Sequence, residues 1–214
     1  MICVPIIEGN LNTCFDALNK ADLIEIRFDK VKFNDYEIKK IFETRRAIAT
    51  FRPDKTTNDE RIEVLTKAIK NGAKYIDIEI ENDESYIREL KRIARENNTQ
   101  VIISYHNFEY TPSKEKLKEI LFSCYELGAD VAKIATMVNE ITDNIRLLSL
   151  YEYKKRMVIL GMGDIGKITR IASLFLGAEF TFASFDDTKS SAPGQISINN
   201  FKRILHLLNN KDYE

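Results

Sequence analysis

The chain has 214 residues, of which 44% are hydrophobic and 30% are charged, and its formal net charge is −1. This length suits one domain with a substantial core and is short for two. The balanced charge argues against a disordered chain and against a polyanionic partner, so we expect no nucleic acid.

Two further features bear on the compartment. No apolar run approaches the length of a membrane span, and the chain begins with an expected strand instead of a signal peptide. Cys3, Cys14 and Cys124 are odd in number and lack metal-ligand spacing, which suits reduced thiols. We therefore expect a cytoplasmic protein with no membrane contact and no bound metal.

Short β-branched runs alternate along the chain with longer segments of helical period. We predict strands at residues 2–7, 23–28, 46–52, 74–80, 100–105, 130–135, 156–162 and 179–184. We predict helices at residues 11–20, 35–44, 59–71, 84–97, 112–127, 139–153, 165–176 and 198–210. Strands that are almost entirely apolar and are each followed by a helix indicate a parallel sheet covered on both faces.

Local signals mark several helix ends. Asn34 with Glu37 and Thr57 with Glu60 have the spacing of capping boxes, and Pro112 is expected at a first helical position. Glycines follow three predicted helices as left-handed caps would, namely Gly72, Gly128 and Gly177. These signals support the predicted alternation of strands and helices.

Eight strand–helix units of about 27 residues each predict a single (β/α)8 TIM barrel, an α/β fold, near the short end of the usual size range. No linker or shift in composition marks a boundary, so we predict one catalytic domain over residues 1–214. Active sites of this fold lie at the carboxyl ends of the strands. The notable residues expected there are Glu25, Arg27, Arg52, Asp77, Glu79, His106, Lys133 and Met162.

Charged groups recur at nearly every predicted strand end, whereas a purely structural barrel would have mostly apolar layers. This recurrence favours an enzyme. A structural interpretation also exists, because Glu25 and Arg27 could form an ion pair inside the barrel. Asp77 and Glu79 could likewise serve a structural role inside the barrel, or they could orient His106 from the neighbouring strand.

Lys133 and His106 are the most informative of these residues. Lys133 lies in the small, apolar segment 130–135, so its amino group would have to leave water. A desolvated lysine loses its proton more readily and can condense with a ketone or aldehyde to form an imine. The alternative is a lysine that extends its charge to the surface. His106 is either a structural histidine or, beside a lysine on the next strand, a general base.

A glycine-rich motif follows the seventh predicted strand. Gly161, Gly163 and Gly166 match G-x-G-x-x-G, and Asp186 lies at a suitable distance downstream for a ribose contact. A dinucleotide site needs a doubly wound half-sheet after this turn, yet the motif falls in the seventh of eight units. We therefore favour glycines that let the backbone approach a bound acid.

Six motifs, in this order and spacing, resemble type I 3-dehydroquinate dehydratase. They are Glu25-x-Arg27, Phe51-Arg52, Ser104-Tyr105-His106-Asn107-Phe108, Ala132-Lys133-Ile134-Ala135, Gly161-Met162-Gly163-x-x-Gly166-x-x-Thr169-Arg170, and Ser191-Ala192-Pro193-Gly194-Gln195. The resemblance runs from the first strand to the last helix. It implies a (β/α)8 barrel, usually a homodimer, that dehydrates 3-dehydroquinate to 3-dehydroshikimate in the shikimate pathway without metal or organic cofactor.

The resemblance also implies roles for individual residues. Lys133 would form the Schiff base and His106 would act as general acid/base. Arg170 would bind the substrate carboxylate, with Ser191 and Gln195 closing a loop over it. The other implied contacts are ring-hydroxyl ligands and apolar walls, namely Glu25, Arg27 and Arg52 as ligands and Met162 and Phe182 as walls.

The chain departs from the family after Arg52. An acidic residue expected near Thr56 is absent, so Glu79 or Glu25 is expected to orient His106 in its place. Two other hypotheses remain at this stage. One is another imine-forming barrel lyase, such as a class I aldolase, which would share Lys133. The other is a noncatalytic or nucleotide-binding protein that uses the glycine turn.

Overall fold

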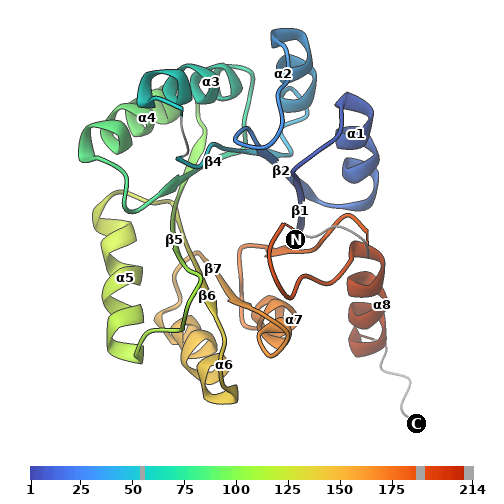
Figure 1. Ribbon diagram of the computed structural model, residues 1–214, viewed down its shortest axis with the longest axis vertical. Coiled ribbons are helices and arrows are strands. Elements are labelled where there is room, and N and C mark those ends of the chain that lie inside the picture. The colour runs from blue at the N-terminus through green and yellow to red at the C-terminus, as the bar shows by residue number, and fades with distance from the viewer. Residues whose placement is uncertain (54–55, 187–190, 210–214) are drawn as a thin grey trace.

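The computed structural model describes residues 1–53, 56–186 and 191–209, and these form a ring of parallel strands surrounded by helices (Figure 1). The strands are β1 (Ile2–Ile6), β2 (Leu23–Arg27), β3 (Ala47–Thr50), β4 (Tyr75–Glu79), β5 (Gln100–Asn107), β6 (Val131–Met137), β7 (Met157–Met162) and β8 (Thr181–Phe182). The helices are α1 (Leu11–Lys20), α2 (Asp35–Phe42), α3 (Asn58–Lys70), α4 (Glu84–Glu96), α5 (Lys114–Glu126), α6 (Ile141–Leu148), the 3-10 helix η1 (Ser149–Tyr153), α7 (Lys167–Phe175) and α8 (Ile198–Asn209).

Every strand pairs in parallel with its neighbours, in the order β7-β6-β5-β4-β3-β2-β1-β8. The seam of the barrel lies between β7 and β8. It is bridged where the backbone N–H of Glu179 donates to the carbonyl oxygen of Met157 over 3.0 Å. The predicted (β/α)8 barrel is therefore confirmed.

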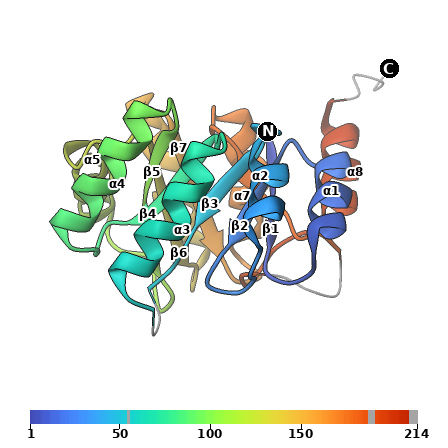
Figure 2. The same cartoon turned by 90° about the horizontal axis from the view of Figure 1, so that it is seen from above.

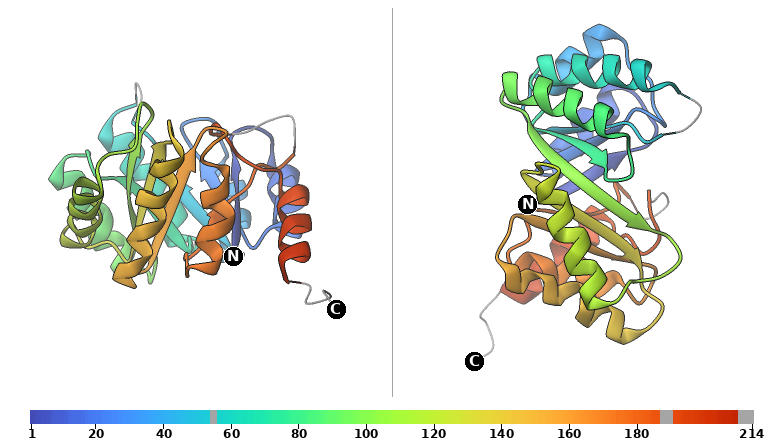
Figure 3. Two further views of the ribbon diagram at one scale, coloured as in Figure 1. Left: turned by 90° about the horizontal axis from the view of Figure 1, so that it is seen from below. Right: turned by 90° about the vertical axis from the view of Figure 1, so that its left-hand side faces the viewer.

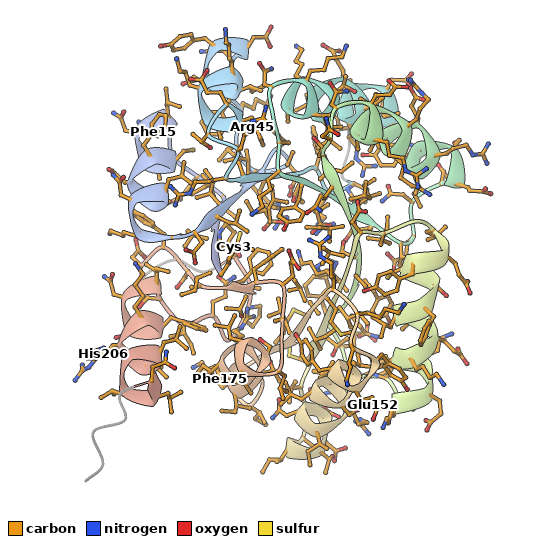
Figure 4. All side chains as sticks on the ribbon, turned by 180° about the vertical axis from the view of Figure 1, so that it is seen from behind. Cys3, Phe15, Arg45, Glu152, Phe175 and His206 are labelled. Carbon is orange, nitrogen blue, oxygen red and sulfur yellow. The ribbon has the colours of Figure 1, made fainter. Side chains whose placement is uncertain are left out.

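The strands bury two separate apolar layers. The larger cluster lies between strands and helices, and a smaller one, which includes Cys3, Leu23, Ile48 and Tyr75, fills the inside of the ring. Figure 4 shows Cys3 in the middle of the molecule. Because side chains alternate along a strand, the next inward positions after the apolar layer are polar. They are Glu25 on β2, Thr50 on β3, Asp77 on β4, Ser104 on β5 and Lys133 on β6, all buried.

The helix signals were largely correct. The capping boxes of Asn34 with Glu37 and of Thr57 with Glu60 are formed. The three cap glycines have positive φ angles. The predicted position of Pro112 is wrong, because Ser113 is the N-cap and α5 starts at Lys114. Pro112 follows Thr111, whose hydroxyl donates to the Met137 carbonyl over 2.7 Å and so ties the loop to the end of β6.

Other boundaries also differ from the predictions. The expected helix at 139–153 divides into α6 and η1, and the expected strands at 46–52 and 179–184 shorten to β3 and β8. Helix α8 is described to Asn209, so the predicted end at Asn210 lies outside the described residues, as do Asp54, Lys55 and Ser190. These differences hardly move the expected site residues, because the six strands other than β3 and β8 end within three residues of their predicted positions.

The two rims of the barrel differ in what they carry. β1 begins and α8 ends at one rim, whereas the loops that follow the strands lie at the other (Figures 2 and 3). The three cysteines are buried free thiols. Within the described part of the chain, no helix combines the length and the apolar character needed to cross a membrane.

Candidate active site

A cavity of about 420 Å3 opens at the rim formed by the carboxyl ends of the strands. All eleven residues singled out from the sequence line it: Glu25, Arg27, Arg52, Glu79, His106, Lys133, Met162, Arg170, Phe182, Ser191 and Gln195. Strands bring most of them together, and the rest come from the segment after β3, from α7 and from the loop after β8. The cavity is large enough for a small ring-shaped substrate.

Lys133 projects from the middle of β6 into this cavity, and only 5% of the residue is exposed. It therefore does not extend its charge to the surface. Its Nζ donates to Oδ2 of Asp77 over 2.8 Å and lies 3.8 Å from Oε1 of Glu25 and 4.6 Å from the Phe182 ring centre. The expected apolar environment is thus incorrect, because two carboxylates face the buried amino group.

Asp77 is the centre of the buried charges. Its Oδ1 lies 2.8 Å from Nη1 of Arg52 and accepts a 2.6 Å hydrogen bond from the Ser104 hydroxyl. Burial alone would raise the pKa of this carboxyl, but Arg52 and Lys133 hold it well below its ordinary range. Asp77 therefore remains a charged acceptor and is unsuited to be a base.

His106 lies near the end of β5, with 14% of its side chain exposed. Its Nδ1 is 3.3 Å from Oε1 of Glu79, and its ring stacks on Phe108 with centres 6.1 Å apart. Burial and the positive charge of Arg52 lower the pKa of His106 to about 4, although Glu79 acts in the opposite direction. The imidazole is therefore neutral near pH 7 and can accept a proton.

Glu25 and Arg27 do not form the ion pair considered from the sequence. Glu25 accepts a 2.8 Å hydrogen bond from the Thr50 hydroxyl and faces Lys133. Arg27 instead makes a bidentate contact to Asp29, with Nε and Nη2 at 2.9 and 2.7 Å from the two carboxylate oxygens. Asp29 thus fixes one arginine of the cavity in place.

Arg170, on α7, is 1% exposed and has almost no partner. Its Nη2 lies 3.5 Å from the Pro193 carbonyl, and its Nε makes no hydrogen bond within the described residues. Burial lowers the pKa of its guanidinium to about 10, and among the described residues no acid acts in the opposite direction. A buried cation without a counter-ion is costly, and its planar fork suits a carboxylate.

The loop after β8 closes one side of the cavity. The Gln195 side chain accepts from the Ser191 backbone N–H and donates to the Ser191 hydroxyl, both over 2.9 Å. The Gly163 backbone N–H donates to the Pro193 carbonyl over 3.2 Å, which joins this loop to the turn after β7. The side of the cavity next to Arg170 is therefore held by internal hydrogen bonds.

The comparison with known proteins is consistent across sequence and structure. The model of the type I 3-dehydroquinase family matches residues 2–212. The 3-dehydroquinate dehydratase of Methanocaldococcus jannaschii is 38% identical over 224 residues, which span 99% of this chain and all of that protein. The chain belongs to the type I 3-dehydroquinase family. As a type I 3-dehydroquinase, it is a lyase of the shikimate pathway and of aromatic biosynthesis.

Other relatives agree with this assignment. A 3-dehydroquinate dehydratase of Methanococcus maripaludis strain C7 is 37% identical over 219 residues, or 97% of this chain and 100% of the relative. The crystal structure of the Aquifex aeolicus 3-dehydroquinate dehydratase has a TM-score of 0.83 and 28% identity, covering 98% of this chain and 99% of that one. An aldolase with 12% identity and a TM-score of 0.57 is similar in fold alone.

The structure identifies the residue beside the histidine of this 3-dehydroquinase. Thr56 occupies the place where an acidic residue was expected, and of the two candidate substitutes only Glu79 reaches His106. Glu25 is engaged with Thr50 and Lys133. His106 and Arg52 keep the pKa of Glu79 low although its burial acts to raise it.

The glycines of the G-x-G-x-x-G motif allow close packing of the chain on itself. A Cβ atom at Gly166 would lie 2.5 Å from the carbonyl carbon of Gly161, and one at Gly194 would overlap the Gly163 carbonyl. The Gly166 N–H donates to the Gly163 carbonyl and the Gly161 N–H to the Thr169 hydroxyl. In this 3-dehydroquinase the turn therefore supports the loop that carries Gln195.

Two contacts in this 3-dehydroquinase site were not predicted: Asp77 contacts Lys133 directly, and Asp29 holds Arg27. Asp77 itself was expected at this end of β4, two residues before Glu79 and on the same face of the strand, but not beside Lys133. Asp29 lies just beyond the end of β2, where strand periodicity no longer applies.

Proposed function

We propose that this enzyme dehydrates 3-dehydroquinate to 3-dehydroshikimate through an imine on Lys133, with His106 as general acid/base. The observation that carries the proposal is one cavity that holds a buried lysine, a neutral histidine and an arginine for which the described part of the chain supplies no counter-ion. The Clostridium difficile type I 3-dehydroquinate dehydratase, with 29% identity and a TM-score of 0.83, was solved with covalent modified comenic acid. This favours covalent chemistry here as well.

The first step joins Nζ of Lys133 to the C3 carbonyl carbon of the substrate, and the carbonyl oxygen leaves as water. The lysine ammonium and the protonated imine carry the same single positive charge. Asp77 and Glu25, which face the amino group, therefore stabilise both species. The protonated imine then serves as an electron sink.

The second step is the elimination. His106 removes a proton from C2, and the electrons of that bond move into the protonated imine to give an enamine, which returns them to form the C1–C2 double bond as the C1 hydroxyl departs. His106 returns the proton to the departing hydroxyl, which leaves as water. Its low pKa keeps the imidazole in the base form, and the imine compensates for weak basicity by acidifying the C2 proton. A second water then hydrolyses the imine and releases the product from Lys133.

The remaining residues would bind and orient the ring. Arg170 binds the substrate carboxylate, because no described side chain neutralises its buried charge. Ser191 and Gln195 close that end of the cavity. Glu25, Arg27 and Arg52 face the ring hydroxyls, and Met162 and Phe182 form apolar walls. The imine supplies the electron sink, so we propose that no metal or organic cofactor takes part.

We also propose that residues 1–214 act as one domain of a cytoplasmic homodimer. The buried free cysteines suit a reducing compartment. The exposed apolar side chains of neighbouring helices support a self-association surface, namely Ile141 and Ile145 on α6 and Ile168 and Phe175 on α7. Figure 4 shows Phe175 on the outside of the molecule. Sedimentation analysis of the wild type and of an Ile145→Asp variant tests this assembly.

Reduction by borohydride in the presence of 3-dehydroquinate tests the imine. We expect a mass increase on the peptide that contains Lys133 and none in a Lys133→Gln variant. Absence of an adduct in the wild type would exclude both the dehydratase mechanism and an aldolase mechanism. Appearance of the ultraviolet absorption of the conjugated enone distinguishes dehydration from other imine chemistry, because an aldolase would not produce it from this substrate.

A further inference from the structure

The charged side chains between Lys133 and His106 form a continuous series. Nζ of Lys133 lies 2.8 Å from Asp77, and the other oxygen of Asp77 lies 2.8 Å from Nη1 of Arg52. The same Nη1 is 3.7 Å from Glu79, and Glu79 is 3.3 Å from Nδ1 of His106. Cations and anions alternate along this series, and Arg52 is at its centre.

We propose that Arg52 is a positioning residue that couples the two catalytic groups electrostatically, with Asp77 and Glu79 as its two arms. This inference rests on the proposed function, in which Lys133 and His106 act on one substrate, and extends it. A role as a ligand for ring hydroxyls alone would not require this geometry. A single nitrogen of Arg52 contacts Asp77 and Ser104 and faces Glu79, so its orientation is set by the protein before substrate binds.

Arg52 and Glu79 act on the imidazole with opposite sign. The charged groups around His106 are Arg52 after β3, Asp77 and Glu79 on β4, and Lys133 on β6. The two cations disfavour the imidazolium and the two carboxylates favour it. Arg52 also neutralises Glu79, which would otherwise be an uncompensated anion beside the ring. Removal of Arg52 would therefore raise the pKa of His106 in two ways. It would remove a cation that repels the imidazolium, and it would leave Glu79 free to attract the imidazolium more strongly.

The test uses the titration of His106 in the ligand-free enzyme. The sequence contains two histidines, so NMR of protein labelled with 13C at histidine Cε1 gives two resonances, and a His106→Asn variant assigns them. His206, on the outer helix α8, provides a reference in the same spectrum (Figure 4). We expect Arg52→Gln to raise the pH at which His106 titrates by on the order of 1 to 2 units, and Glu79→Gln to lower it.

Three further variants complete the test. Arg52→Lys retains the cation and is expected to titrate nearer to the wild type than Arg52→Gln. The double variant Arg52→Gln/Glu79→Gln is expected to fall between the two single variants. Arg156→Gln removes a cation at the opposite rim, where Arg156 pairs with Glu179 at 2.7 Å, and should leave the His106 titration unchanged.

The proposal is overturned if the His106 titration in Arg52→Gln remains within about 0.3 units of the wild type, or if Arg52→Gln and Glu79→Gln shift it in the same direction. If Arg52→Gln does not fold, Glu79→Gln still tests the series, because a His106 titration that Glu79→Gln leaves unchanged or raises would overturn the proposal. An unshifted titration beside a Lys133 adduct would refute the coupling alone. A shifted titration without an adduct would refute the proposed function alone.

Discussion

Asp77 uses its two carboxylate oxygens for two different cations: Oδ2 lies 2.8 Å from Nζ of Lys133 and Oδ1 lies 2.8 Å from Nη1 of Arg52. One buried side chain therefore compensates the proposed nucleophile and an arginine of the same cavity. Asp77 and Lys133 are almost inaccessible to water, so water cannot replace this carboxylate beside the lysine.

Asp77→Asn should lose most activity and reduce the free energy of unfolding by about 3 kcal/mol, because it leaves the buried Lys133 and the half-buried Arg52 with one fewer counter-charge. Urea denaturation and initial rates at saturating substrate measure the two effects. Glu179→Gln is the matched control, because Glu179 pairs with Arg156 at the opposite rim. Equal losses of activity in the two variants would show that Asp77 has only a structural role.

Arg170→Met should raise KM roughly ten- to hundredfold, since hydrogen bonds to a charged group contribute about 1.5 to 3 kcal/mol. The ligand-free variant should be at least as stable as the wild type, because Met removes a buried charge that no described side chain compensates. Steady-state kinetics and thermal unfolding check both statements. Arg88→Met, on the exposed face of α4, is the control. A variant with unaltered KM, or with markedly lower stability, contradicts the anion-binding role.

His106 makes stability depend on pH between about 6.5 and about 4. Its pKa is lowered from 6.5 in the unfolded chain to about 4 in the folded one, so the unfolded chain binds more protons in this window. Stability therefore falls as pH decreases through the window, by up to about 3 kcal/mol. Asp77 and Glu79, whose pKa values are lowered, lose their contribution only at more acidic pH.

His106→Asn separates these windows. Denaturation curves recorded from pH 7 to below pH 4 should give this variant a free energy of unfolding that is nearly constant between pH 6.5 and 4, whereas the loss of stability at lower pH should remain. A wild-type slope that persists in His106→Asn would mean that another group titrates there.

Gly194→Ala should raise KM and weaken closure around Gln195, because the added methyl would overlap the Gly163 carbonyl and φ is +75°. Gly177→Ala is the control, since its φ is +95° but the added methyl meets nothing within 4 Å. The control should lose about 1 kcal/mol of stability from backbone strain and keep its KM. If both variants have the same kinetics, the packing of the two loops does not shape the substrate site.

Strand–helix alternation was sufficient to predict the barrel and to place strand residues such as Glu25, Glu79 and Lys133 at its cavity, because an inward position on a strand is fixed by a period of two. The family resemblance was needed for Arg170 on α7 and for Ser191 and Gln195 on the loop after β8. The sequence also indicated that Glu79 or Glu25 would face His106. The choice between them needed the pairing of β4 with β5, which aligns Glu79 with Ser104 and brings it beside the histidine.

Contacts between distant segments could not be predicted in the same way. The hydrophobicity of residues 130–135 suggested an apolar environment for Lys133, but its actual neighbours come from β2 and β4. Similarly, Pro112 in isolation suggests a helix start, whereas Thr111 anchors that segment to Met137 and delays the helix until Lys114. In both cases a partner far away in sequence determines the outcome.

The separation of the two rims has a consequence for assembly with other proteins. β1 begins and α8 ends at the rim opposite the cavity (Figure 2). A second catalytic module joined to either end of this barrel would thus leave substrate entry unobstructed. Such a fusion would also leave the opening of the cavity on the side away from the junction. An intermediate passed between the fused units would then have to travel through bulk solvent.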